Sequence, residues 1–194
     1  MGVREEKNDI REKYKALKAS ISDNEKEAFD QAVFKHFTNS LSYRHCKSIV
    51  IYVSRADEVK TTTIIQKALE DGKTIAVPKC MPTNLSMDFF EIKSLDDLEK
   101  GTYGILEPNT LCKKVDALNF QLCIVPAVCF DLEGFRIGFG KGYYDRFLEK
   151  FTGVKMGLTY SCLITKKLPR GRFDQKIEII ISEKGVSRIE KGNK

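Results

Sequence analysis

Residues 122–131 read LCIVPAVCFD, an apolar, partly β-branched run that ends on one acidic residue. A second run of this kind, IEIIIS, covers residues 177–182. Strands that are apolar on both faces are typical of the centre of a parallel sheet covered by helices. The two runs therefore predict central strands of an α/β fold, and 122–131 is expected to form one strand that ends near Asp131.

Around these runs, short apolar strand patterns alternate with helical patterns. Further strands are expected within residues 47–54, 73–80, 87–92 and 155–161, and helices over 61–71 and from about 143 to 151. This alternation indicates βαβ units. The expected architecture is a single three-layer α/β/α domain over residues 1–194, with a mainly parallel, Rossmann-like central sheet.

The first 41 residues predict a pair of helices packed on that sheet. Ile10, Tyr14 and Leu17 recur at helical spacing, and Ser22 with Glu25 forms a capping box for the second helix. No strand is expected before residue 46.

Composition narrows the class of protein. The chain has 194 residues, a formal net charge of +6 and no apolar run close to the roughly 20 residues of a membrane span. Its N-terminus is charged from the fourth residue, unlike a secretory signal, and its six cysteines include no CxxC pair. These features predict a cytoplasmic monomer with reduced, mostly buried cysteines and no membrane partner. Basic and acidic residues are intermixed, so nucleic acid is not expected as a partner.

Directly after 122–131, residues 138–147 read GFGKGYYDRF. Phe135 stands where a P-loop has its first glycine, and Tyr143 where the dinucleotide fingerprint has its third, so neither motif fits. Unhindered backbone before a helix nevertheless suits phosphate. Arg136 and Lys141 would add charge there, and Asp145 could hold a magnesium ion. A spacious strand-to-helix turn explains the same glycines equally well.

Five segments, in order along the chain, resemble the 5-formyltetrahydrofolate cyclo-ligase family. The longest is VPAVCFDLEGFRIGFGKGYYDRFL (125–148), which resembles the family signature VP-x-x-x-FD followed by G-x-R-[LI]-G-x-G-x-G-YYD. The others are KNDIR (7–11), YVSRADEVKT (52–61), GILEP (104–108) and FDQKIEIIISEKG (173–185). The resemblance covers nearly the whole chain.

The resemblance implies an enzyme that uses ATP as co-substrate and Mg²⁺ to cyclise 5-formyltetrahydrofolate to 5,10-methenyltetrahydrofolate, with release of ADP and phosphate. The formyl oxygen attacks the γ-phosphate, and N10 then closes the ring. This chemistry needs positioning and positive charge around the transferring phosphoryl group. A non-catalytic nucleotide- or RNA-binding module on the same scaffold is the alternative.

The resemblance also implies roles for single residues. Arg136 and Lys141 are the expected catalytic cations. The residues expected to bind ATP are Lys7, Arg11, Arg136, Gly138, Gly140, Lys141, Gly142, Tyr143 and Tyr144. Those expected to bind the folate are Val53, Glu58, Tyr103 and Tyr144, and those expected to hold the metal are Asp145 and Asp174.

Three positions depart from the family pattern. Phe139 replaces the Tyr or Arg that is common between the first two glycines, which removes a polar group. Phe173 replaces the His that usually precedes the aspartate at 174, and Glu178 replaces an Asp.

Overall fold

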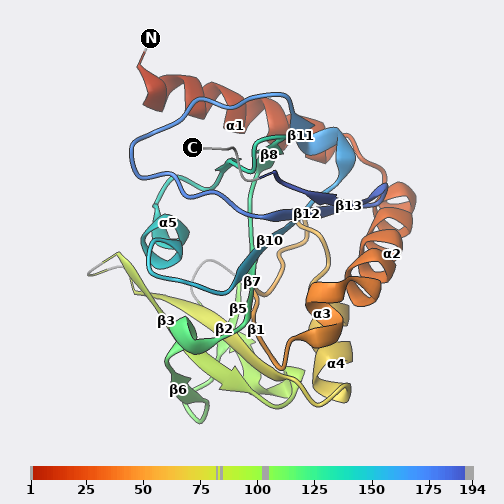
Figure 1. The fold of residues 1–194 in the computed structure, drawn as a ribbon, viewed down its shortest axis with the longest axis vertical. Coiled ribbons are helices and arrows are strands. Elements are labelled where there is room, and N and C mark those ends of the chain that lie inside the picture. The colour runs from red at the N-terminus through yellow and green to blue at the C-terminus, as the bar shows by residue number, and fades with distance from the viewer. Residues whose placement is uncertain (1, 82, 84, 102–104, 191–194) are drawn as a thin grey trace.

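The computed structural model describes residues 2–81, 83, 85–101 and 105–190 (Figure 1). A sheet of eight strands forms its centre. In order across the sheet the strands are β13 (Gly185–Arg188), β12 (Ile179–Ser182), β10 (Val154–Leu158), β7 (Leu122–Val125), β1 (Ser48–Val50), β2 (Thr74–Met81), β3 (Ser86–Ile92) and β6 (Lys113–Val115). The strands from β12 to β2 pair in parallel, which confirms the mainly parallel sheet.

The edges of the sheet are antiparallel. β12 and β13 pair antiparallel at one edge, and β2, β3 and β6 do so at the other. The segment 87–92 is therefore joined to the strand before it as an antiparallel neighbour, without a βαβ crossover.

The expectation of one continuous strand over 122–131 is wrong. β7 ends at Val125, and β8 (Cys129–Asp131) belongs to a separate small sheet with β11 (Ile164–Thr165) and β9 (Arg136–Ile137). Pro126 stands at the break, and proline cannot donate a ladder hydrogen bond in a central strand. The chain therefore leaves the main sheet there, and β8 and β9 carry it to the glycine loop.

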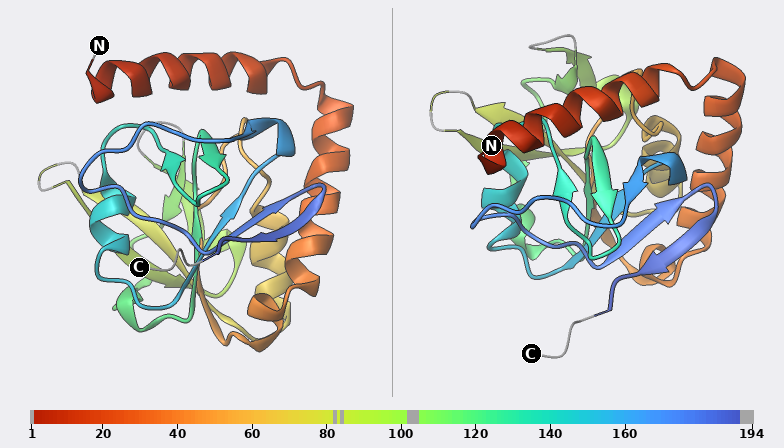
Figure 2. Two further views of the ribbon diagram at one scale, coloured as in Figure 1. Left: turned by 45° about the horizontal axis from the view of Figure 1, so that its top comes forward. Right: turned by 90° about the horizontal axis from the view of Figure 1, so that it is seen from above.

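Helices lie on both faces of the sheet, as Figure 1 shows. α2 (Asp23–Asn39), α3 (Leu41–His45) and α4 (Thr62–Glu70) cover one face, and the short α5 (Tyr143–Leu148) covers the other. α1 (Val3–Ala19) runs across one end of the domain and meets α2 at a sharp corner (Figure 2). The predicted N-terminal helix pair is confirmed, including the capping box in which the Ser22 hydroxyl accepts from the Glu25 N–H.

Successive side chains of a strand point to opposite faces of the sheet, and they enter two separate parts of the core. On β7, Leu122 and Ile124 join the apolar cluster on the α2 side, while Cys123 and Val125 join the cluster on the α5 side. All four side chains are completely buried. This two-sided burial is what the apolar run predicted, and it confirms the three-layer arrangement.

The remaining elements are short. The three-residue 3₁₀ turns η1 (Leu95–Asp97), η3 (Ala117–Asn119) and η4 (Ser161–Leu163) connect larger elements, and β4 (Leu98–Lys100) pairs with β5 (Leu106–Pro108). All six cysteines are free, and Cys46, Cys123 and Cys129 are the buried ones. Within the described ranges, no helix is both long enough and apolar enough to cross a bilayer.

Candidate active site

The sheet changes its direction of winding between β1 and β7. From β1 the chain passes through α4 to its neighbour β2, whereas β7 and then β10 lie on the other side of β1. In doubly wound sheets, ligands bind outside the carboxyl ends of the strands at such a switch point. The loop after β1, residues 51–61, and the path from β7 to the glycine loop both start there.

The glycine loop, residues 138–142, leaves its backbone open. Gly140 and Gly142 adopt φ values of +92° and +69°, a region that L side chains rarely enter. Within the described part of the chain, no N–H from Gly138 to Gly142 donates a hydrogen bond to another residue. The loop therefore presents free amide donors, as an anion-binding loop requires.

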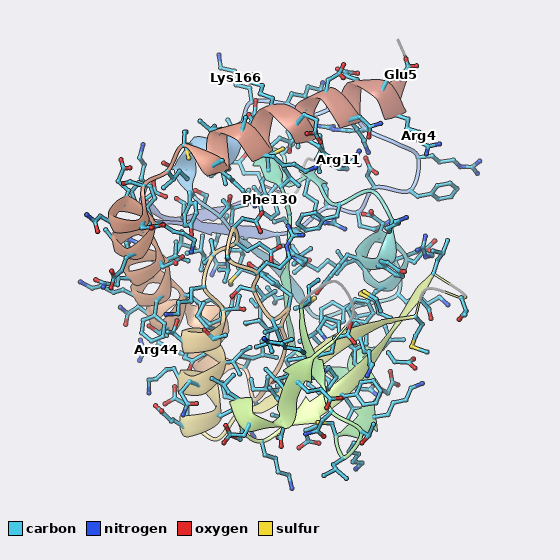
Figure 3. The ribbon with its side chains drawn as sticks, turned by 180° about the vertical axis from the view of Figure 1, so that it is seen from behind. Arg4, Glu5, Arg11, Arg44, Phe130 and Lys166 are labelled. Carbon is cyan, nitrogen blue, oxygen red and sulfur yellow. The ribbon has the colours of Figure 1, made fainter. Side chains whose placement is uncertain are left out.

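α1 lies against this loop. The Arg11 Nε donates a hydrogen bond of 2.7 Å to the Gly138 carbonyl, and its guanidinium lies 3.5 Å from where a Cβ on Gly140 would be. Figure 3 shows the Arg11 side chain pointing from α1 into the body of the domain. Arg11 therefore faces the domain and places its positive charge beside the loop.

Arg136 and Asp145 form an ion pair beneath the loop. The Arg136 Nη2 donates to Asp145 Oδ1 at 2.7 Å, and its Nη1 donates to the Gln175 carbonyl at 2.9 Å. Only 6% of Arg136 is exposed. The Gln175 N–H also donates to Asp145 Oδ1, at 3.3 Å. The pair thus joins β9, the start of α5 and the segment after Asp174.

Lys7 and Asp174 form a second ion pair, between α1 and that segment. Both side chains are largely buried, with 14% and 17% exposed. Asp174 Oδ2 also accepts from the Gly171 N–H at 2.8 Å. Because Gln175 contacts Asp145, the two aspartates predicted to hold metal lie in one neighbourhood, each beside a cation.

The two aspartates retain free oxygens. Within the described residues, Asp145 Oδ2 and Asp174 Oδ1 accept no hydrogen bond, and no group of three or more His, Cys, Asp or Glu side chains is arranged to hold a metal ion. Mg²⁺ commonly takes one or two carboxylates and completes its shell with phosphate oxygens and water. The donors fit a Mg²⁺ that arrives with a triphosphate.

Lys141 is the freest cation of the glycine loop. It is exposed, and its ammonium has no hydrogen-bond or ion-pair partner among the residues that the structure describes. The neighbouring Arg146 donates to the Lys141 carbonyl at 2.8 Å and lies over the Tyr143 ring at 5.7 Å. Lys141 is therefore held by its backbone while its charge stays available.

Two of the residues predicted to bind folate, Val53 and Glu58, lie in the loop after β1. Glu58 is 6% exposed, and its Oε2 accepts from the Arg55 N–H at 2.9 Å. Burial raises the pKa of Glu58, and the Arg55 N–H and guanidinium oppose that rise. Val53 is also buried. Tyr103 lies outside the described residues.

Tyr144 connects the two sides. It belongs to α5 directly after the glycine loop, yet its hydroxyl is buried and has no hydrogen-bond partner in the described structure. Burial raises the pKa of Tyr144 well above its ordinary value, and the nearby Cys123, Tyr52 and Glu58 reinforce this. A buried hydroxyl without a hydrogen-bond partner in the described structure is suited to a polar ligand atom.

A small cavity of about 10 Å³ lies beside Glu58, room for about one water. Its lining comes from α1 and from the carboxyl ends of β1, β7 and β10: Lys18, Tyr52, Glu58, Val59, Ala127, Leu158, Thr159, Tyr160 and Leu163. Sequence reasoning missed Lys18. Its spacing from Lys7 and Arg11 would have placed it on the same face of α1.

Two departures from the family pattern do not enter this site. The Phe173 side chain is 71% exposed, and Glu178 accepts a backbone hydrogen bond from Lys155. The neighbouring Arg170 is paired with Glu133 at 2.6 Å and with the buried Asp131 at 3.5 Å. These two carboxylates therefore partly neutralise the positive charge of Arg170, which precedes Asp174 by four positions.

The mainly parallel sheet with its switch point defines an α/β protein, and the glycine loop with its free amides and surrounding cations is its candidate anion-binding site. The family model of the 5-formyltetrahydrofolate cyclo-ligase family matches residues 3–183. The chain therefore belongs to that family, and the resemblance seen in its sequence is confirmed.

Named relatives agree. A protein of Caenorhabditis elegans described as a probable 5-formyltetrahydrofolate cyclo-ligase is 30% identical over 93% of this chain and 94% of its own length. The 5-formyltetrahydrofolate cyclo-ligase of Haemophilus influenzae is 28% identical over 88% of this chain and 94% of its own.

Solved structures share the fold. The NMR structure of Aquifex aeolicus 5,10-methenyltetrahydrofolate synthetase superposes with a TM-score of 0.86 at 30% identity, covering 97% of this chain and 95% of that one. The 5,10-methenyltetrahydrofolate synthetase of Mycoplasma pneumoniae, at 23% identity and a TM-score of 0.73, covers 91% and 98% and supports the fold alone.

Proposed function

We propose that this protein is an ATP- and Mg²⁺-dependent enzyme that cyclises 5-formyltetrahydrofolate to 5,10-methenyltetrahydrofolate. Membership of the family supports this reaction. The observation that carries it is Tyr144, which directly follows the glycine loop and whose buried hydroxyl has no hydrogen-bond partner in the described structure. A phosphoryl donor and a folate bound on these two sides would meet at their junction.

The reaction has two bond-forming steps. The formyl oxygen attacks the γ-phosphorus of ATP, an O–P bond forms, and the bond from that phosphorus to the β-phosphate oxygen breaks to release ADP. N10 then attacks the activated formyl carbon and loses its proton. The carbon–oxygen bond to the phosphoryl group breaks, and phosphate leaves with that oxygen.

On the nucleotide side, the free amides of residues 138–142 would receive phosphate oxygens. Lys141 is the cation that can move onto them, because it has no competing partner in the described structure. Arg11 and Arg136 act from fixed positions, since each is already bonded to the backbone around the loop. Fixed, preorganised charge stabilises a phosphoryl-transfer transition state without reorganisation cost.

Asp145 and Asp174 are the residues that would hold Mg²⁺. The ion would supply charge neutralisation for the phosphates. The chain's own contribution is to keep both carboxylates in place through Arg136 and Lys7.

On the folate side, the ionised Glu58 would accept the paired N–H donors of the pterin ring, an arrangement that one carboxylate can receive through both oxygens. Val53 would provide apolar contact, and the Tyr144 hydroxyl would gain the partner that it lacks. We further propose that the chain acts as a monomer.

The test is turnover by the purified chain. Mixing it with Mg²⁺, ATP and 5-formyltetrahydrofolate should produce the near-ultraviolet absorbance of the methenyl product, with one ADP formed per product. Reactions without ATP, or with a non-hydrolysable ATP analogue, serve as controls. A folded protein that gives no absorbance change contradicts the proposal, and RNA binding with steep salt dependence would then favour the non-catalytic alternative.

A further inference from the structure

Arg55 lies where the loop after β1 meets the glycine loop. Its guanidinium carbon is 4.3 Å from the centre of the Phe139 ring, close enough for a cation–π contact. The same side chain extends past Glu58, with its Nε 4.0 Å from Glu58 Oε2. One arginine therefore contacts the loop expected to bind phosphate and the carboxylate expected to bind folate.

Carboxylates hold the Arg55 guanidinium in place, but one of its donors stays unused. Its Nη2 contacts Asp57 at 3.2 Å, and 47% of that aspartate is exposed. Asp57 is shared with the largely buried Lys18, 3.9 Å away. The Arg55 Nε is buried and donates no hydrogen bond within the described structure. A guanidinium with an unused buried donor is prepared for an anionic partner.

The Phe139 ring supports the Arg55 guanidinium. An arginine that stacks its flat face on an aromatic ring keeps the N–H donors at its edge free for a phosphate. Phe139 is 41% exposed on a loop whose neighbours are glycines and a lysine. A large apolar side chain at that position gains little from burial, and its contact with Arg55 gives it a role.

We propose that Arg55, stacked on Phe139, binds the transferring phosphoryl group from the folate side. The inference rests on the proposed function and adds a catalytic residue to it, with Phe139 as its positioning residue. During transfer, charge spreads over the equatorial oxygens of the phosphoryl group. The Arg55 N–H groups stabilise that charge at the point where the formyl oxygen attacks, opposite the amides of the glycine loop.

Four variants test the assignment: Arg55→Met, Arg55→Ala, Arg55→Lys and Phe139→Leu. Loss of a donor to a developing oxyanion typically lowers kcat by about 100-fold, so Arg55→Met should do so while KM for each substrate changes less than about threefold, as expected for a transition-state contact. The kcat of Arg55→Lys should lie between that of the unmodified chain and that of Arg55→Met, because an ammonium keeps the charge but lacks the planar fork of a guanidinium. Phe139→Leu should lower kcat by roughly tenfold through the lost stacking.

Two readouts separate this role from a structural one. Millimolar guanidinium should restore part of kcat to Arg55→Ala, which leaves space for it, and none to Arg55→Met, whose side chain fills that space. In the Arg55→Met background, Phe139→Leu should cause almost no further loss of kcat, because the two residues act as one unit. Arg44→Met, an exposed arginine on α3 far from Arg11 in Figure 3, is the matched control and should leave kcat unchanged.

The outcomes are distinguishable. If the unmodified chain turns over and both Arg55→Met and Arg55→Ala stay within about twofold of it, this inference is overturned and the proposed function stands. Loss of kcat without rescue by guanidinium, together with a lower thermal midpoint, also overturns it. If the unmodified, folded chain gives no turnover, that result contradicts both the proposed function and this inference.

Discussion

The proposed nucleotide side and the proposed folate side of the site hold their carboxylates differently. Around the glycine loop, the carboxylates are each paired with a cation, as in Asp145 with Arg136 and Asp174 with Lys7. In the loop after β1, the carboxylate proposed to bind the pterin is Glu58, which is 6% exposed and has a pKa raised by burial. The difference matches a flexible polyanion with its metal on one side and a flat ring system on the other.

The difference also concerns how each side is held. Arg136 and Lys7 bind carboxylates on other elements, so their ion pairs join α1, β9, α5 and the segment before β12. Glu58 instead accepts from the N–H of Arg55 within its own loop. Substitutions of Arg136 or Lys7 should therefore disturb both catalysis and the packing of these elements, whereas substitution of Glu58 should act mainly on the binding of one substrate.

The largest expected effect comes from Arg136→Ala. Removing this buried guanidinium leaves Asp145 without its partner and the loop without a fixed charge. We expect kcat/KM to fall by about 10²- to 10³-fold, the usual effect of losing one preorganised contact to a transition state. Initial rates of methenyl formation would measure it.

Arg136→Lys is the matched variant, since it keeps the charge and loses the fork that reaches both Asp145 and the Gln175 carbonyl. A rate for Arg136→Ala equal to that of the unmodified chain would remove the loop from the mechanism.

Glu58→Gln should have the next largest effect, and it sharpens the contrast because it should be selective. The amide can accept with only one oxygen, so the paired donors of the pterin lose a charged, two-oxygen partner. We expect KM for 5-formyltetrahydrofolate to rise by roughly 10- to 100-fold, and KM for ATP to stay within about twofold. Steady-state kinetics with each substrate varied in turn would test this, and equal changes in both KM values would contradict the division into two sides.

Asp174→Asn should raise the Mg²⁺ concentration needed for half-maximal activity by about tenfold, since one of two carboxylates is lost. The variant also frees Lys7 from its ion pair. Because both residues lie on the proposed nucleotide side, KM for folate should not change. Glu12→Gln is the control, since Glu12 is an exposed acid on α1 whose ion-pair partner within the described residues is Lys15 alone. An unchanged Mg²⁺ titration for Asp174→Asn would exclude the aspartate from metal binding.

The smallest effect concerns stability against pH. The pKa of Glu58 is raised above 4.5 by burial, so the folded protein holds this proton at a higher pH than the unfolded chain does. As pH rises from below 4.5 through the raised pKa, the unmodified chain should lose unfolding free energy relative to Glu58→Gln, with a slope of at most about 1.4 kcal/mol per pH unit.

Urea unfolding of both proteins across that range measures the difference. A difference that stays constant with pH, or that grows in favour of the unmodified chain, would contradict the raised pKa.

The class of fold and the family could both be predicted from the amino-acid sequence. The apolar residues Leu122 to Val125 need burial on both faces, as in a sheet between two layers of helices. The alternation of strand patterns with helical patterns predicted that this sheet is mainly parallel. The motif from Arg136 to Asp145 predicted a phosphate-binding loop from its glycines and nearby charges, and this role remains a prediction.

Which of these residues contact one another depends on the packing of the folded chain. Lys7 and Asp174 lie near opposite ends of the chain, and their ion pair forms because α1 crosses one end of the domain. Nothing in local sequence shows that the Arg55 guanidinium lies over the Phe139 ring or that the Tyr144 hydroxyl is buried without a hydrogen-bond partner in the described structure. Local pattern reflects propensity and periodicity, whereas a contact between distant segments depends on how packed layers bring loops together at the end of a sheet.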